Sequence, residues 1–399
     1  MKAVIIGAGE EALHTIEKAH NLGIQITALD GNPKAAGLSA ADKGLVVDIS
    51  DEKETIETVS KEQPDFILTV PIGRYLTTIG AVNDALGLPG ITGEMAALCT
   101  DKYRFHEKLA MQGLRDCYCY AVGTGDKGTD HMNMNTDPEI EFPAILKPRY
   151  GSGSRGIHMI GNRQELATAL LQIEGEEYVL EDCVPGEEYG VDGAVIQGKF
   201  YMTLLRKKIN TPPPHRQAVG YFSCTQEDAF RRQVYDYMEK VINCLGLQEC
   251  LLHCDLIRGE KGPFVIELSA RPSGHNLHNL FTPLCTGIDP AEEYIKCRLG
   301  RPFNFIPKYT KHMLIHYFDG QGRVTKVPDA MQIEQLLQKE RNSGEQTKLI
   351  RWHCNITAGE ILQPVSDGHS VMGRGYYILE GDDEEAMLKL TGVITNSFC

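Results

Sequence analysis

Two acidic residues that interrupt apolar segments are the first candidates for chemistry. Asp255 lies in LLHCDLIRG and Glu267 in GPFVIELSARP, and the turn RGEKG between them predicts two adjacent antiparallel strands. A carboxylate on such an apolar face is costly unless it is paired or binds a cation. Two carboxylates that meet there suit Mg²⁺, a hard ion that prefers oxygen ligands and keeps its phosphate partners.

Arg271 follows Glu267 on the same predicted strand face, because side chains alternate along a strand. Two interpretations remain open for this arginine. It could pair with Glu267 and serve the fold, or it could hold a transferring phosphate group.

A glycine- and serine-rich turn follows a lysine at the end of another apolar strand. Lys147 closes the run AILK, and residues 151–156 are GSGSRG. Three glycines let backbone N–H groups converge on an anion, while the serine and arginine side chains add donors. The neighbouring lysine could neutralise phosphate oxygens. The pattern favours a flexible glycine lid between two strands, and the alternative is a long solvated hairpin.

An acidic connector, VLEDCVPGEEY at 179–189, joins two further predicted strands. It could present backbone groups to an adenine edge and a carboxylate to ribose hydroxyls. A solvated acidic turn explains the same residues equally well.

The N-terminal glycines offer a different hypothesis. Gly7-Ala8-Gly9 follows the first strand and opens a helix, and Asp30 closes the next strand, as in a dinucleotide fingerprint. However, any doubly wound sheet needs a glycine at its first tight turn. Glu10 and Glu11 also lie where a pyrophosphate would approach, and they would repel it.

The elements that must position these residues change along the chain. Strand and helix signals alternate over the first hundred residues, which favours a parallel sheet with helices on both faces. The segment 92–113 is predicted to be helical throughout, and the polar stretch 123–138 is predicted to be a loop. Antiparallel strands, a helix over 226–246 and the acidic strand pair follow. The part from about residue 301 is predicted to be a smaller α+β domain.

The bulk composition limits the partners. The chain has 399 residues, enough for two or three domains, with a formal net charge of −14. We do not expect a chain with this much negative charge to bind nucleic acid or an anionic membrane, because both would repel it. No apolar run approaches the roughly 20 residues that span a bilayer, and the N-terminus does not resemble a signal peptide. We therefore expect a cytoplasmic protein whose 12 cysteines are reduced.

Taken together and in this order, the motifs resemble the ATP-grasp superfamily over nearly the whole chain. They look closest to its carboxylate–amine ligases, which join L-amino acids into dipeptides. The resemblance implies an α/β and α+β multidomain fold. Its parts are a Rossmann-like pre-ATP-grasp domain (1–95), an ATP-grasp domain (96–303) with a glycine-rich lid subdomain (about 115–184), and a small α+β C-terminal domain (304–399). A pre-ATP-grasp domain usually binds no nicotinamide, which weakens the dinucleotide hypothesis.

The resemblance also assigns residues. Arg271 matches the catalytic arginine near the transferred phosphate. The residues implied to bind nucleotide are Lys102, Lys147, Gly151, Ser152, Gly153, Ser154, Gly156, Glu181, Asp182, Cys183, Val184 and Glu188. The implied metal ligands are Asp255, Glu267 and Ser269. Ser269 departs from the family's usual Glu-x-Asn, and its short side chain leaves open how many metal ions bind.

The implied reaction consumes ATP with Mg²⁺, or alternatively Mn²⁺, and joins a small-molecule carboxylate to an amine, with amino acids as the expected substrates. A homodimer is compatible with the resemblance. His275 and His278 either shape a substrate pocket or pack, and the 207–220 loop and Gly73-Arg74 are further candidates for substrate contacts. The competing hypotheses are an NAD(P)-dependent oxidoreductase, a bicarbonate-activating relative and a non-catalytic nucleotide-binding protein.

Overall fold

A computed structural model describes the chain except for residues 74, 118, 123–139, 152, 154, 174–176, 213–215, 226–227, 341–345, 367 and 399. Ser152, Ser154, Arg74 and the loop predicted over 123–138 therefore lie outside the described residues. Within the part that is described, no helix is both long and apolar enough to cross a bilayer. The cysteines in this part are all free thiols.

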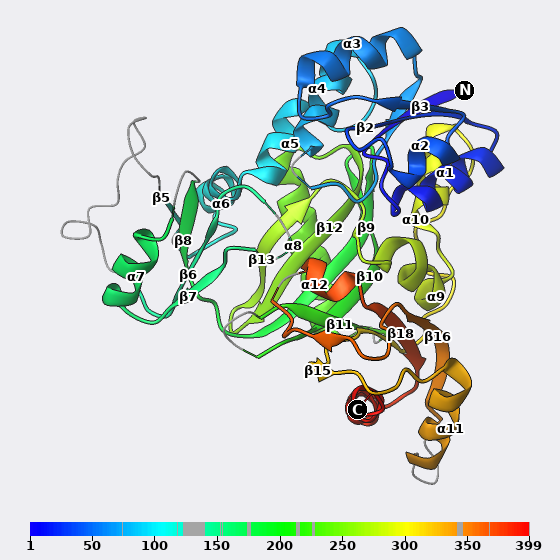
Figure 1. Ribbon diagram of the computed structural model, residues 1–399. Coiled ribbons are helices and arrows are strands. Elements are labelled where there is room, and N and C mark those ends of the chain that lie inside the picture. The colour runs from blue at the N-terminus through cyan, green and yellow to red at the C-terminus, as the bar shows by residue number, and fades with distance from the viewer. Residues whose placement is uncertain are drawn as a thin grey trace.

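The N-terminal part is a four-stranded parallel sheet with the order β3-β2-β1-β4 (Figure 1). Its strands are β1 (Lys2–Ile6), β2 (Gln25–Asp30), β3 (Lys43–Val46) and β4 (Phe66–Leu68), and its helices are α1 (Ala12–Asn21), α2 (Ala36–Ala40), α3 (Glu52–Glu62) and α4 (Leu76–Leu86). Alternate residues of β1 enter two different cores: Val4 packs in the cluster with α3 and α4, whereas Ile5 packs in the cluster with α1. The predicted parallel sheet with helices on both faces is confirmed.

The prediction of one continuous helix over 92–113 is wrong. The segment forms α5 (Gly93–Thr100) and α6 (Lys102–Met111), separated by Asp101, whose backbone is extended (φ −95°, ψ 100°). The Asp101 carboxylate accepts two backbone N–H groups from the first turn of α6, which starts a new helix. The same carboxylate accepts two hydrogen bonds, of 2.8 and 2.7 Å, from the Arg149 guanidinium.

A small antiparallel sheet with the order β5-β8-β6-β7 lies within the predicted lid subdomain (Figure 1). Its elements are β5 (Cys119–Val122), β6 (Ala144–Pro148), β7 (His158–Ile160), α7 (Arg163–Leu170) and β8 (Tyr178–Asp182). Leu146, Leu166 and Leu180 belong to a core of its own. Because β6 and β7 pair on either side of the glycine-rich segment, the predicted strand–turn–strand unit is confirmed.

The main sheet has eight strands in the order β13-β12-β9-β10-β11-β14-β18-β16 (Figure 1). These are β9 (Glu187–Ile196), β10 (Lys199–Asn210), β11 (Ala218–Ser223), β12 (Glu249–Gly259), β13 (Gly262–Ser269), β14 (Met313–Tyr317), β16 (Lys348–Cys354) and β18 (Gly375–Glu380). All neighbouring strands pair antiparallel. The sheet continues across the predicted boundary at residue 303, and that boundary stays a prediction.

Helices and short elements cover this sheet. They are α8 (Ala229–Leu245), a π-helical turn (Leu277–Phe281), α9 (Thr282–Thr286), α10 (Pro290–Arg298), β15 (Gly322–Arg323), α11 (Ala330–Glu340), β17 (Ile361–Leu362), α12 (Gly368–Met372) and α13 (Glu384–Asn396). The predicted helix over 226–246 corresponds to α8, whose apolar face packs in the same core as β9, β12 and β13. The combination of an α/β part with α+β parts is confirmed.

A buried ion pair crosses the middle of the main sheet. Arg206 on β10 donates two hydrogen bonds of 2.8 Å to Asp192 on β9, and both side chains are almost completely buried. The Thr282 hydroxyl donates a third hydrogen bond to the same carboxylate at 3.1 Å. Removing the acid would leave a guanidinium buried without its partner, which is much more costly than losing an exposed pair.

We predict that Asp192→Ala lowers the free energy of unfolding by about 3–5 kcal/mol, because Arg206 stays buried and charged. Urea denaturation followed by circular dichroism would measure the change. Asp116→Ala is the matched control, since its partner Lys261 is 87% exposed, and it should cost less than about 1 kcal/mol. Equal losses for the two variants would contradict the prediction.

Candidate functional site

One large cavity brings together most of the residues singled out in the sequence. It encloses about 440 Å³ and is lined by residues from all parts of the chain. The predicted site residues that line it are Lys102, Lys147, Gly151, Gly153, Glu181, Asp182, Cys183, Val184, Glu188, Asp255, Glu267 and Arg271. Ser269 lines a smaller adjoining cavity, and Gly156 lines neither.

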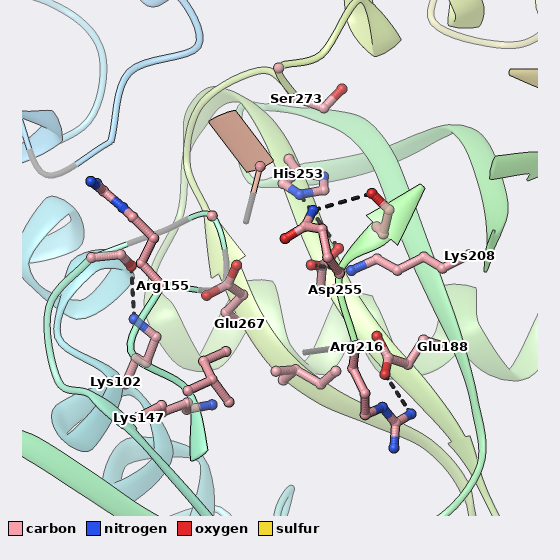
Figure 2. Close-up of a pocket in the computed structure, with 18 of the residues that line it drawn as sticks. Lys102, Lys147, Arg155, Glu188, Lys208, Arg216, His253, Asp255, Glu267 and Ser273 are labelled. Carbon is pink, nitrogen blue, oxygen red and sulfur yellow. Dashed lines mark hydrogen bonds and ion pairs between the residues drawn. The ribbon is translucent and has the colours of Figure 1, made fainter. Parts of the chain in front are cut away.

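The two strand acids are neighbours across β12 and β13. Asp255 is directly opposite Glu267 in the antiparallel register, and His253 is opposite Ser269. Residues paired in this way have Cβ atoms roughly 4.5–5.5 Å apart. Figure 2 shows Asp255 and Glu267 directed toward the same space, with Lys102 and Lys147 on the other side of Glu267. The predicted pairing of the two strands is confirmed.

The oxygen atoms of this pair fit a hard cation. Lys208 pairs with Asp255 Oδ2, whereas the buried Oδ1 atom accepts no hydrogen bond in the described part of the chain. Burial alone would raise the pKa of Asp255, but the charges of Lys208, His253 and Arg206 together with the Lys208 hydrogen bond keep that pKa below its ordinary value. The Glu267 carboxylate forms no ion pair or hydrogen bond with any residue in the described ranges. Carboxylate oxygens without protein donors are what Mg²⁺ would need at this position.

Arg271 does not form the structural ion pair with Glu267 that was one of the two interpretations. No contact within 4.0 Å joins their charged atoms. Its Nη1 atom donates to the Pro272 carbonyl at 2.8 Å, and its buried Nε atom has no acceptor among the described residues. Burial lowers the pKa of Arg271 below its ordinary value, against the opposing effect of Glu267 and Glu11. The guanidinium thus retains donors for an anion in the cavity.

The two predicted nucleotide lysines are held by different contacts. Lys102 Nζ donates to the Gly151 carbonyl at 2.8 Å, and burial lowers the pKa of this lysine. Lys147 Nζ lies 2.5 Å from the Glu181 carboxylate. Glu181 was expected in an adenine-binding connector, yet its side chain is buried beneath that connector and anchors the lysine.

Glu181 also contacts two residues that the sequence reasoning missed. His106 Nε2 and Arg115 Nη2 lie 3.2 and 3.1 Å from its Oε2 atom. Burial alone would raise the pKa of Glu181, but the neighbouring Lys147, His106 and Arg115 hold it far below its ordinary value. His106 could have been found, because it lies one helical turn after Lys102 on α6. No local sequence pattern identifies Arg115 as a site residue, because its partner Glu181 is 66 residues away in the sequence.

His253 is another residue that the sequence reasoning missed. It lines both cavities, and its ring nitrogens lie 3.7 Å from Asp192 and 3.5 Å from Asp255. The sequence could have indicated this residue, because His253 is two residues before Asp255 and side chains at that spacing lie on one face of a strand.

The segment 207–220, predicted as a loop, is partly strand: β10 ends at Asn210 and β11 begins at Ala218. Residues near both of its ends line the cavity. Lys208 lies on β10, and Arg216 precedes β11 with a positive φ of 47°. The Arg216 guanidinium donates to Glu188 at 2.8 Å, and Figure 2 shows this pair beside the cavity. Glu188, expected near a ribose, therefore has a cationic partner of its own.

The segment after Arg271 is conformationally unusual. His275 and Asn276 both have positive φ values, 63° and 58°, and a π-helical turn follows them. Such features cluster at functional sites. His275 lines the cavity, whereas His278 is buried and its Nδ1 atom lies 2.6 Å from the Ser273 carbonyl. Burial lowers the pKa of His278 to about 4, as is typical of a packed neutral histidine.

The N-terminal glycine turn does not present its acid to a ligand. Asp30 accepts hydrogen bonds from the backbone N–H groups of Ala8 and Asn32 at 2.7 and 2.8 Å. Both carboxylate oxygens thus stabilise the turn itself. A dinucleotide would need this carboxylate for its ribose, so the geometry argues against that hypothesis.

The buried cation cluster around Glu181 predicts a pH effect on stability. Burial lowers the pKa of His106 to about 4, from 6.5 in an unfolded chain. Between these two pH values the unfolded chain binds more protons than the folded chain, so stability falls as the pH is lowered through this range. At 1.36 kcal/mol per pKa unit, the full effect is roughly 3 kcal/mol.

We predict that His106→Asn reduces the loss of unfolding free energy between pH 6.5 and pH 4. Urea denaturation at several pH values would measure the slope for wild type and variant. His20→Asn, which changes a histidine with 37% of its side chain exposed, should leave the slope as it is. Parallel slopes for wild type and His106→Asn would refute a buried neutral imidazole.

Comparisons with known proteins agree with this geometry. Residues 140–278 match the model of the ATP-grasp domain family. The uncharacterized protein y4rH of Sinorhizobium fredii is 26% identical over 65% of this chain and 56% of its own length. Dapdiamide A synthase of Enterobacter agglomerans is 24% identical over 59% of this chain and 58% of its own length. The chain thus spans a little over half the length of these two relatives.

Two further proteins are similar over a larger share of this chain. Formate-dependent phosphoribosylglycinamide formyltransferase of Prochlorococcus marinus is 21% identical over 84% of this chain and 86% of its own length. The crystal structure of the L-amino acid ligase from Bacillus licheniformis superposes with a TM-score of 0.78 at 18% identity, covering 99% of this chain and 97% of that protein. The matched family model and the shared fold lead to one conclusion: residues 140–278 of this chain form an ATP-grasp domain, within a fold like that of the L-amino acid ligase.

Proposed function

We propose that the protein is an ATP-dependent carboxylate–amine ligase that forms an amide or peptide bond and releases ADP and phosphate. The observation that carries this proposal is the pairing of Asp255 with Glu267 in one cavity with Lys102 and Lys147. Two acids that keep carboxylate oxygens without protein donors, and lysines around the same cavity, suit a metal-bound triphosphate. The names of two similar proteins, dapdiamide A synthase and L-amino acid ligase, favour amino acids as substrates.

The carboxylate substrate must be activated before an amine can attack it. Without activation the leaving group would be oxide, which is a very poor leaving group, whereas an acyl phosphate loses phosphate. In the proposed first step a carboxylate oxygen attacks the γ-phosphorus of ATP, the bond to the β-phosphate oxygen breaks, and ADP leaves. The amine then attacks the carbonyl carbon of the acyl phosphate. The C–O bond to phosphate breaks, inorganic phosphate leaves, and the amine loses a proton.

The residues of the cavity would mainly position reactants and offset charge, as in other phosphoryl transfers. Lys102 and Lys147 would offset the charge of the nucleotide phosphates, with Lys147 held in place by Glu181. Mg²⁺ or Mn²⁺ held by Asp255 and Glu267 would neutralise the terminal phosphates. Arg271 is the proposed catalytic residue, since it lines the cavity and its Nε atom has no acceptor among the described residues.

Water must be kept from the acyl phosphate, and the glycine segment is suited to that task. Gly151 and Gly153 line the cavity, and the Gly368 N–H of α12 approaches the Gly153 carbonyl at 3.4 Å. The lid sheet and the C-terminal part thus meet above the site. Such closure excludes water from reactive intermediates.

The first prediction concerns coupling. The protein should release phosphate from ATP only when a suitable carboxylate and a suitable amine are both present, because the carboxylate forms the acyl phosphate and the amine then displaces phosphate from it. A phosphate-release screen over pairs of amino acids would measure it. Phosphate release that depends on bicarbonate would support the bicarbonate-activating alternative. Tight ATP binding without any release would support a non-catalytic nucleotide-binding protein.

The second prediction concerns Glu267. Glu267→Gln should lower turnover about 100-fold or more at low Mg²⁺, because an amide holds a divalent ion less strongly than a carboxylate. Part of the loss should be recovered at high Mg²⁺ or Mn²⁺. Glu260→Gln, in the exposed turn of the same hairpin, is the control and should keep full turnover. A Glu267→Gln enzyme with unchanged metal dependence would argue against a metal at this site.

A further inference from the structure

A carboxylate from the N-terminal domain enters the cavity and has no role in the proposed reaction so far. Glu11 occupies the N-cap position of α1, yet its side chain makes no capping hydrogen bond to that helix. It lines the cavity instead, alongside Pro71 and Ile72 of the same domain. A residue that could have capped its own helix is thus directed toward the ligand space.

The partners of Glu11 come from the strained segment of the other domain. The Asn276 backbone N–H donates to Oε1 at 3.4 Å, which is at the long limit for a hydrogen bond. Oε2 lies over Gly274, where an added Cβ atom would be only 3.0 Å away. In the described part of the chain, no lysine or arginine forms an ion pair with this carboxylate. Its charge is therefore only partly compensated by the protein.

The surroundings of Glu11 favour a cation as the missing partner. Burial raises the pKa of Glu11, against the opposing effects of the His275 and Asn276 backbone N–H groups and the Arg271 charge. A positively charged ligand would offset this desolvation, whereas a phosphate or a second carboxylate would be repelled. Ile72 and Leu277 add apolar surface to the same wall of the cavity.

Arg271 supplies the opposite charge within the electrostatic reach of Glu11. A guanidinium with free donors suits a carboxylate, and a carboxylate with a weak partner suits an ammonium group. One small molecule that carries both groups close together is an α-amino acid. Simple carboxylates such as formate or bicarbonate would leave Glu11 without a partner.

We infer that Glu11 binds the ammonium group of the carboxylate substrate, so that Glu11 and Arg271 together select an α-amino acid as the acyl donor. This inference rests on the proposed ligase function and names the class of one substrate. It makes Glu11 a specificity-determining residue contributed by the N-terminal domain. The apolar residues beside it would contact the amino-acid side chain.

The test compares each amino acid that supports phosphate release with the des-amino acid of the same skeleton, such as L-alanine with propionate or L-leucine with 4-methylpentanoate. Wild type should prefer the amino acid at least about 100-fold in kcat/KM, because a buried charge left unpaired is costly. Glu11→Gln should reduce this preference about 10–100-fold, mainly through the KM of the amino acid. The KM of ATP and the melting temperature should remain unchanged.

Two further variants separate recognition from folding. Gly274→Ala keeps every charge but crowds Glu11 Oε2, and it should also raise the KM of the amino acid. Glu10→Gln changes an exposed neighbour that does not line the cavity, and it should keep the wild-type preference. Equal preference in wild type, Glu11→Gln and Gly274→Ala would overturn the inference while the ligase function stands. A wild type that releases phosphate with no carboxylate–amine pair would instead overturn the proposed function and the inference with it.

Discussion

The register between β12 and β13 is the constraint on which the site depends. It sets Asp255 opposite Glu267, and a slip of one residue would turn both acids to the other face of the sheet. Between the turn and this pair the register shifts by one residue, at Asp255/Leu256, and the apolar residues that alternate with the acids, such as Cys254 and Leu268, are buried in the core. The same apolar pattern that stabilises the hairpin therefore positions its carboxylates.

Charge is divided between the parts of the molecule that surround the cavity. Lys102 comes from α6, Lys147 from β6 and Arg155 from the segment between β6 and β7, whereas the strand acids come from the main sheet (Figure 2). Within the main sheet, Lys208 partly compensates the negative charge near Asp255. Under the proposed function, this division would let an anionic nucleotide lie between the cationic side chains and the acidic ones, with a metal ion bridging to the acids.

Much of this arrangement follows from local patterns in the sequence. Alternating apolar residues and a short turn predict the β12–β13 hairpin, and glycines after a strand predict the β6–β7 unit. The continuous helix over 92–113 was predicted wrongly because helical periodicity runs through Asp101, while the capping bonds of that residue favour a new helix start. Contacts between distant residues left no such pattern. The Arg115–Glu181 pair and the entry of Glu11 into the cavity depend on how segments far apart in the sequence pack together.

The break at Asp101 also has a mechanical consequence. Its carboxylate binds both the first turn of α6 and the Arg149 guanidinium, and the Lys102 backbone N–H donates to the Arg149 carbonyl at 3.2 Å. Lys102 on α6 and Lys147 on β6 are thereby linked through the contacts of Asp101 and Arg149. Under the proposed function, this linkage would hold the two ammonium groups in a fixed relation to each other, so that both would be in place for the phosphates of one nucleotide.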